Sequence, residues 1–411
     1  MNLNTTKLWS CQCLFLLMLY TSVTGRGEAI EIPDPGLEQS IRNALDKSSG
    51  HITSQEMADL RVLDAGGKNL FSTRGLEHAV NLASLDLRFN QLTNLHLPQR
   101  MLALTNLNVG SNFLKDGTFL DRMPKLQNLG LWGNRLEQLE LPVDISDLRI
   151  LNLSANRLTK VRVPESWHKL RELNLQNNQI EQFDLPVGFT NLTLLDLQNN
   201  QLSKAVFPDG LIALKTLELS GNQLSKLYLP DDMQSLEQHF LSLDKATNAE
   251  FELVNAPKNL EWLSLFGNGL RQLSLPSAMP RMKVLSLRSN RLVDLSFLQS
   301  LPRLESLNLS DNDLYTLVFP AGLDHLRHLT LSRNWLHDLF LPDGMTSLTH
   351  LNLSDNRLAS LKMPNGPQAM ISLDLSDNPI KTLEMPEGIP MKQLQLKGIN
   401  KKKVTYYTTV F

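Results

Sequence analysis

The fold is decided by the segment LRILNLSANRLTKVRVPESWHKLRELNLQNNQI, residues 148–180. Both ends of this segment carry one pattern, L-x-x-L-x-L-x-x-N, and the second copy begins 22 residues after the first. Alternate side chains of an extended strand point to the same side, so the L-x-L core places both leucines on one face. A single unit is too small to bury that face, which indicates that neighbouring copies stack against each other.

The pattern recurs along most of the chain, which contains 87 leucines among 411 residues. Lys68 stands one period before the first asparagine, and Asp244 one period after the seventh. Asp244 and Asn268 are 24 residues apart, so we place a two-residue insertion between them, in an irregular unit at 236–259. A degenerate last copy begins at Met391. About sixteen copies therefore cover residues 60–400, and their asparagines should form a buried polar ladder at the turn after each strand: Asn90, Asn112, Asn134, Asn156, Asn178, Asn200, Asn222, Asn268, Asn290, Asn312, Asn334, Asn356 and Asn378.

The full unit reads L-x-x-L-x-L-x-x-N-x-L-x-x-L-x-L-P, and it resembles the leucine-rich repeat family. The resemblance implies an α/β-type solenoid that is curved, with a parallel β-sheet on its concave side. The second half of the unit ends in proline, as in NQLTNLHLP at 90–98, and proline disfavours a long helix there. We therefore expect a convex side made mostly of short strands and turns.

The N-terminal segment predicts export. Residues 1–25 read as a signal peptide, with Lys7 before a short apolar core that contains LFLLML. The alternative is an uncleaved anchor, although the apolar run is shorter than the roughly 20 residues that a spanning helix needs. Cys11 and Cys13 both lie inside this segment, so the mature chain would contain neither disulfide nor thiolate chemistry. We expect a secreted or cell-surface protein, with the periplasm as a further compartment that such a signal allows.

The flanks of the repeats predict caps. Residues 26–59 contain IPDPGLEQSIRNAL and the capping box Thr53–Glu56, which indicate two short helices. This arrangement resembles the helical N-terminal cap of bacterial exported, internalin-like leucine-rich repeat proteins. Residues 401–411 are expected to be a C-terminal tail or a cap strand.

Composition excludes several classes of partner and of chemistry. The net charge is −2, from 40 basic and 42 acidic residues, which gives no electrostatic case for nucleic acid, and the mature chain has no membrane-spanning run. No phosphate-binding loop, H-E-x-x-H or G-x-S-x-G motif occurs, so we expect no enzyme and no cofactor. His328 and His350 share one strand position in adjacent repeats, about 5 Å apart. They are either a two-histidine metal site or two exposed strand residues; without a third ligand we predict no metal.

The outward-facing positions supply the candidate binding sites. In the numbering L1-x-x-L4-x-L6-x-x-N9, positions 3, 5, 7 and 8 face outward or border the sheet, and position 5 is mostly small and polar. Aromatic and arginine side chains dominate many protein interfaces. We therefore predict a ligand-binding patch formed by Phe240 at position 5, Trp262 and Phe266 at positions 3 and 7 of the next unit, and Arg288; the alternative is that the irregular unit repacks with Phe240 turned inward. A secondary candidate comprises Arg88, Phe89 and Trp132.

Two functions follow from these features. The first is a non-catalytic, exported protein that recognises another protein or a surface glycan through its concave face, as partners of this family generally bind there. The second is a structural or adhesive surface component without one specific ligand. The aromatic patch favours the first function, and the uniform polar face favours the second.

Overall fold

The computed structural model describes residues 27–236, 240–243, 250–365, 369–386, 395–398 and 404–407. The chain divides into two compact units. The first runs to Leu136 and includes Asp144–Leu148, and the second comprises Glu137–Val143 and Arg149 onward. The predicted signal peptide at 1–25, His239, Asp244 and the lysine triplet at 401–403 lie outside the described residues.

The first unit begins with the helical cap. Helix α2 (Pro35–Ala44) buries Leu37 and Ile41 on one face, and Asp34 caps its N-terminus. Helix α3 (Ser54–Asp59) starts at the capping box of Thr53 and Glu56 and buries Met57. Two 3-10 helices follow in the connections of this unit, η1 (Leu76–His78) and η2 (Leu120–Arg122). The fold-class prediction of a short helical cap is therefore confirmed.

Each repeat contributes one three-residue strand to a parallel sheet. The middle residue of the strand is the inward leucine of position 4, so the burial alternates as the period of two requires. The first unit holds four such strands in sequence order: β1 (Val62–Asp64), β2 (Ser84–Asp86), β3 (Asn106–Asn108) and β4 (Asn128–Gly130).

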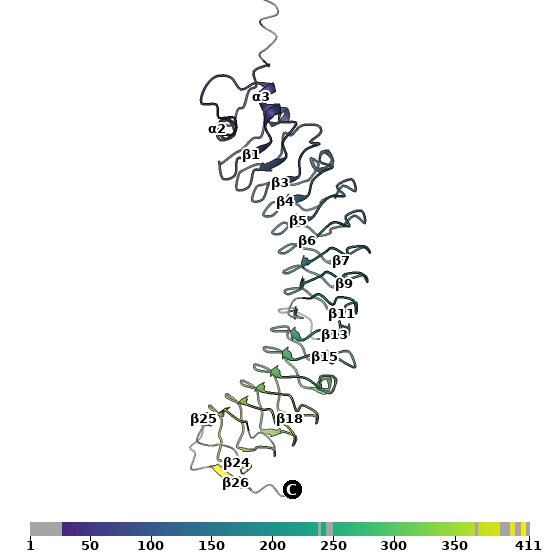
Figure 1. Cartoon of the computed structure of the whole chain (residues 1–411). Coiled ribbons are helices and arrows are strands. Elements are labelled where there is room, and N and C mark those ends of the chain that lie inside the picture. Colours follow the sequence, from purple (N-terminus) through teal and green to yellow (C-terminus); the bar gives the residue numbers. More distant parts are fainter. Residues whose placement is uncertain are drawn as a thin grey trace, which may run out of the picture. The chain divides into compact units, whose positions relative to one another are not determined.

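The second unit continues this arrangement with twelve main-sheet strands within the described residues, each hydrogen-bonded to the next. Figure 1 shows them stacked in one row within this unit. They are β5 (Ile150–Asn152), β6 (Glu172–Asn174), β8 (Leu194–Asp196), β10 (Thr216–Glu218), β12 (Phe240–Ser242), β14 (Trp262–Ser264), β16 (Val284–Ser286), β17 (Ser306–Asn308), β19 (His328–Thr330), β21 (His350–Asn352), β23 (Ser372–Asp374) and β25 (Gln395–Lys397).

The opposite side of the second unit consists of short strands and turns, as predicted (Figure 1). These strands form separate small sheets, and a 3-10 helix, η4 (Ser296–Ser300), replaces one of them. The sheets are β7 (Gln182–Asp184) with β9 (Lys204–Val206); β11 (Lys226–Tyr228) with β13 (Glu250–Asn255) and β15 (Gln272–Ser274); β18 (Thr316–Val318) with β20 (Asp338–Phe340); and β22 (Ser360–Lys362) with β24 (Thr382–Pro386) and β26 (Val404–Tyr407).

The asparagine of position 9 joins each rung to the one before it. The Nδ2 of Asn178 donates to the carbonyls of Leu153 and Leu175, both at 3.0 Å, and its Oδ1 accepts from the N–H of Leu158 at 3.0 Å. Asn178 is only 8% exposed, so its polar atoms replace water for backbone groups that the turn would leave unpaired. The core is thus made of leucine layers with a polar seam along one side.

One rung departs from the predicted register. Glu218 is the Cα partner of Ser242, a step of 24 residues, whereas Phe240 is the partner of Trp262, a step of 22. The two inserted residues therefore precede β12, and the prediction that they follow Asp244 is wrong. The physical reason is the strand period: in this register Leu241 is the Cα partner of the buried Leu263, and Leu243, two residues on, is 3% exposed.

Candidate functional site

The new register changes the main candidate patch. Phe240 lies at position 3 of its rung and not at position 5, because it is the Cα partner of Trp262. Trp262 is in turn the Cα partner of Val284. Three adjacent strands therefore have a phenylalanine, a tryptophan and a valine as Cα partners in one row, which we call the apolar row. Trp262 and Val284 are both half-buried.

Beside the apolar row, Phe266 and Arg288 come together at position 7 of adjacent rungs. The guanidinium carbon of Arg288 lies 5.8 Å from the centroid of the Phe266 ring, within the range of a cation–π contact. The Nε of Arg288 also lies 2.9 Å from Asp311 Oδ2. Arg333 lies 3.6 Å from Asp311 and 3.6 Å from Asp355, so a ladder of alternating charges borders this part of the sheet. Arg288 is thereby held in place at the edge of the patch.

Position 5 is less available to a partner than its polar composition suggests. The Oδ1 of Asn152 accepts from the backbone N–H of Ser154 at 3.0 Å, and Asn174 accepts in the same way from Gln176 at 3.0 Å. These side chains turn the backbone out of the strand instead of projecting from it. Positions 3 and 7 therefore carry most of the chemistry that an approaching surface would meet.

The secondary candidate is a direct aromatic contact in the first unit. The rings of Phe89 and Trp132 meet edge to face, with centroids 5.2 Å apart and an interplanar angle of 72°. Trp132 lies against Gly110, where an added Cβ would come within 2.2 Å of the indole ring, so glycine is what makes room for it. Phe89 is 56% exposed and has a φ of 57°, which is unusual for a bulky residue. Arg88 pairs with Asp86 at 3.1 Å.

Several exposed aromatic pairs lie outside the sheet positions that sequence reasoning considered. Arg357 lies 4.2 Å over the ring of Trp335, and Arg135 lies 4.3 Å over the ring of Phe113. In both pairs the aromatic residue follows the asparagine directly, and the arginine comes 22 residues later. This repeat-to-repeat spacing is a sequence signal that would have found them. Val284 was missed because the apolar row exists only in the corrected register.

The histidine pair is also on the sheet face. His328 and His350 are Cα partners, and their rings stack with centroids 4.8 Å apart and an interplanar angle of 18°. Partial burial lowers the pKa of His328, and the neighbouring His350 and Arg327 lower it further. Within the described ranges no group of three or more histidine, cysteine, aspartate or glutamate side chains is arranged around a common metal position.

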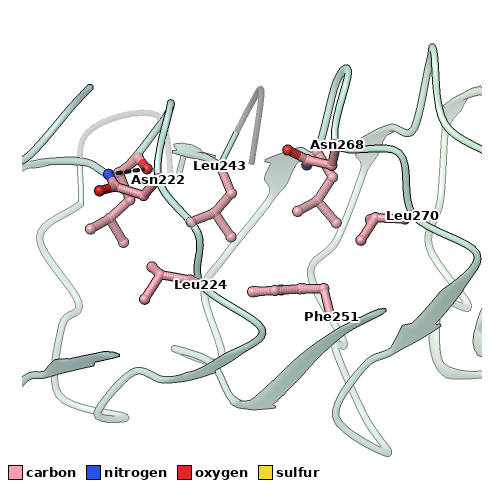
Figure 2. Close-up of a pocket in the computed structure, with 8 residues that line it drawn as sticks. Asn222, Leu224, Leu243, Phe251, Asn268 and Leu270 are labelled. Carbon is pink, nitrogen blue, oxygen red and sulfur yellow. Dashed lines mark hydrogen bonds between the residues drawn. The ribbon is translucent and has the colours of Figure 1, made fainter. Parts of the chain in front are cut away.

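A small cavity lies in the core beside the irregular rung (Figure 2). It is lined by Leu219, Asn222, Leu224, Leu243, Phe251, Leu265, Asn268 and Leu270, and Figure 2 shows the Phe251 ring reaching in between Leu224 and Asn268. Its volume is about 10 Å³, which is close to the least that one water molecule needs. The cavity is therefore a packing defect of the irregular rung, too small to hold a ligand.

Membrane and family relationships complete the description. None of the helices in the part of the chain that the structure describes has the length and apolar character needed to cross a bilayer. Comparison with curated proteins gives no match. The sequence matches the family model for Leucine Rich repeats (2 copies) over residues 146–187 and 280–318, and that for a single Leucine Rich repeat over residues 344–360.

Solved structures with a similar architecture come from several bacteria. The functional domain of InlJ from Listeria monocytogenes is 18% identical, with 82% of this chain and 83% of that chain covered and a TM-score of 0.47. The leucine-rich effector YopM from Yersinia pestis is 25% identical, with 90% and 92% covered and a TM-score of 0.48. A leucine-rich repeat protein from Leptospira interrogans is 22% identical, with 84% and 97% covered and a TM-score of 0.43.

The family matches fall on the same units that the structure stacks. Each matched segment contains the L-x-x-L-x-L-x-x-N pattern, with its strand in the parallel sheet and its asparagine in the polar seam. Stacked repeats of this kind present extended surfaces, which typically serve for interaction with other proteins and not for catalysis. This chain is a leucine-rich repeat protein.

Proposed function

We propose that this protein is exported, has no catalytic activity, and recognises a partner protein through the sheet face of its second unit. The contact centres on the apolar row of Phe240, Trp262 and Val284, together with Phe266 and Arg288. The single observation that carries the proposal is the row itself, because three adjacent strands bring these side-chain types into register.

The chemistry of the patch suits a protein interface. Tryptophan and arginine are the residues whose truncation most often weakens protein–protein complexes, and they do so from partly desolvated positions near the centre of a contact. Trp262 and Phe266 are half-buried, so their rings are held by the scaffold and lose little conformational freedom on binding. The charge ladder around Asp311 supplies a polar rim on one side.

The proposal of export rests on the sequence of residues 1–25. An alternative function, as a structural or adhesive surface component, is favoured by the position-5 side chains that are used in turns and leave a uniform polar face. The two functions differ in one respect: only a recognition protein needs the apolar row to be intact.

Binding of a purified partner to matched variants tests the proposal. Residues 26–411 are immobilised, partners are captured from intact cells or culture medium of the source organism, and each is then purified and titrated against the protein. Trp262→Ala combined with Phe266→Ala is expected to weaken binding at least tenfold, the usual size of a hot-spot truncation. The matched control is Trp335→Ala, because Trp335 is also aromatic, lies under an arginine and is 48% exposed, but lies outside the sheet face.

Each outcome has a distinct meaning once circular dichroism shows that the variants are folded. Loss of binding in the double variant, with normal binding in the control, supports recognition through the sheet face. Equal binding by the wild type and the double variant refutes the patch. If neither the wild type nor any variant binds a captured protein, the structural role is favoured.

A further inference from the structure

The stacked histidines form a chemical feature that partner recognition does not require. His328 and His350 occupy position 3 of β19 and β21, two strands that pair directly. Their neighbours in the same row are Ser306 and Ser372, so small hydroxyl side chains flank the two rings. His328 is exposed and His350 is half-buried. Both rings are therefore open to solvent on the outward side of the sheet.

The hydrogen bonds around His350 determine where its free lone pair lies. The hydroxyl of Thr349 donates its only proton to the carbonyl of Arg327, at 3.0 Å. The Nδ1 of His350 lies 2.9 Å from that same hydroxyl oxygen, which can then only accept, so Nδ1 carries a hydrogen and donates it. In the neutral ring the lone pair is left on Nε2. Metal-binding histidines are commonly oriented in this way, with the other ring nitrogen donating to a fixed acceptor.

The sequence alone predicted no metal here, but the stacked rings and the orienting hydroxyl of Thr349 change that inference. We propose that His328 and His350 form a surface site for one divalent transition-metal ion, with one ring nitrogen of each residue as a ligand. Imidazole is a good ligand for Cu²⁺, Ni²⁺ and Zn²⁺, and Cu²⁺ is bound most tightly of the divalent ions by such ligands. With no third histidine, cysteine or carboxylate placed around a common position within the described ranges, water completes the coordination. The nearby charges are Glu305 and Arg327, which oppose each other in sign.

Rotation of one ring brings the pair from the stack into a coordinating arrangement. Two metal–nitrogen bonds of about 2.0–2.1 Å span roughly 4 Å at most. The ring centroids are 4.8 Å apart and the ring planes differ by 18°, so one ring must turn out of the stack before a single ion can lie in both ring planes. His328 makes this turn, because Thr349 holds the ring of His350. Rotation about the Cβ–Cγ bond of histidine has a broad energy minimum, so the turn costs little. The strand register holds the two backbones side by side, so the two side chains start from neighbouring positions.

Titration of the full chain with Cu²⁺ alone tests this site. The protein is prepared without a histidine tag, and binding is followed by calorimetry and by electron paramagnetic resonance. We expect one ion per chain at a site whose affinity falls at least tenfold in His328→Gln and in His350→Gln. His337→Gln is the matched control, because the ring of His337 also lies against an aromatic ring, with its centroid 4.3 Å from that of Tyr315, and its Nδ1 lies 3.0 Å from the carbonyl of Trp335.

A second variant tests the orienting role of the hydroxyl. Thr349→Val keeps the shape of the side chain and removes the acceptor, and we expect roughly tenfold weaker Cu²⁺ binding, as for other changes behind a metal-bound histidine. The proposal is overturned if the double variant His328→Gln, His350→Gln binds Cu²⁺ with the stoichiometry and affinity of the wild type. It is also overturned if His337→Gln lowers the affinity as much as either substitution in the pair.

Discussion

At the scale of single residues, the asparagine of position 9 makes several hydrogen bonds to the backbone of two successive rungs. In Asn178, three hydrogen bonds join two successive rungs, and all three involve backbone groups that the surrounding leucines shield from water. No apolar side chain can replace it, because the backbone donor and acceptors would then be buried without partners. The ladder therefore contributes both stability and the fixed geometry of the turn.

Replacing Asn178 by alanine should lower the free energy of unfolding by on the order of 3 kcal/mol, since buried backbone groups lose their partners. The midpoint of urea unfolding measures the loss. Asn191→Ala is the control, because Asn191 is exposed and donates an exposed hydrogen bond to the carbonyl of His168, so its loss should be within about 0.5 kcal/mol. Equal effects of the two substitutions would contradict the role given to the ladder.

A carboxylate on the sheet face gives a pH-dependent prediction. Burial raises the pKa of Asp196 above its ordinary value of 3.8, against the lowering effect of the Gln198 N–H. At pH values between 3.8 and the raised pKa, the folded state then binds more protons than the unfolded state. The free energy of unfolding therefore falls as the pH rises through that window. Asp196→Asn removes this fall and keeps an acceptor for Gln198.

The thermal midpoint of Asp196→Asn should therefore exceed that of the wild type at pH 7, and the difference should shrink below pH 3.8. Asp184→Asn, at an exposed position of β7, serves as the control for the loss of one carboxylate away from the sheet face. A difference for Asp196→Asn that grows in acid would have the wrong sign and would refute the argument.

At the scale of elements, one aspartate ties the helical cap to the first repeat. The Oδ1 of Asp34 accepts from Gly36 and Leu37 at the start of α2, at 3.0 and 3.2 Å. Its Oδ2 accepts from the N–H groups of Phe71 and Ser72, at 2.8 and 3.2 Å. Asp34 is 2% exposed, so its carboxylate is shielded from water, and the bond to Leu37 is fully buried. The side chain is at once a helix cap and a link between two elements.

We expect Asp34→Ala to lower the free energy of unfolding by about 2–4 kcal/mol, because it removes a buried carboxylate that accepts from four backbone N–H groups in two elements. Thr53→Ala removes only the cap of α3, at a less buried site, and should cost about 1 kcal/mol. Thermal unfolding of both variants measures the difference. If Asp34→Ala costs no more than Thr53→Ala, the link between cap and repeat is not what stabilises this end.

The strands were predictable as elements wherever the repeat is regular, because the inward leucines and the asparagine mark both ends of each one. This reasoning fails at the irregular rung. Counting 22 residues from Asn222 puts Phe240 at position 5, yet the strand pairs so that Phe240 is the Cα partner of Trp262, at position 3. An inserted pair of residues can be accommodated before or after the strand, and only the packing of the neighbouring rungs selects between these possibilities.

At the scale of the whole molecule, each rung contacts mainly the rungs before and after it. One whole repeat can therefore be deleted while the remaining repeats still stack in phase. Removing residues 171–192 joins Leu170 to Thr193 in the correct phase, since one complete period is lost. We expect this variant to keep the circular dichroism spectrum and cooperative unfolding of the wild type. Removing only residues 171–181 shifts the phase by half a period and should abolish cooperative unfolding. Similar behaviour of the two deletions would contradict nearest-neighbour stacking.

The local pattern alone establishes the period, the inward leucines, the polar seam and the helical cap, because each depends on contacts that every repeat makes in the same way. The local pattern does not determine which side chains become neighbours across strands. The apolar row of Phe240, Trp262 and Val284 and the contact of Phe89 with Trp132 join residues from separate rungs. Their placement depends on strand register and on the room left by Gly110. The outward surface, where we propose that the partner binds, was therefore decided by lateral pairing in the folded chain, since the core constrains the inward side chains and leaves the outward ones free to vary.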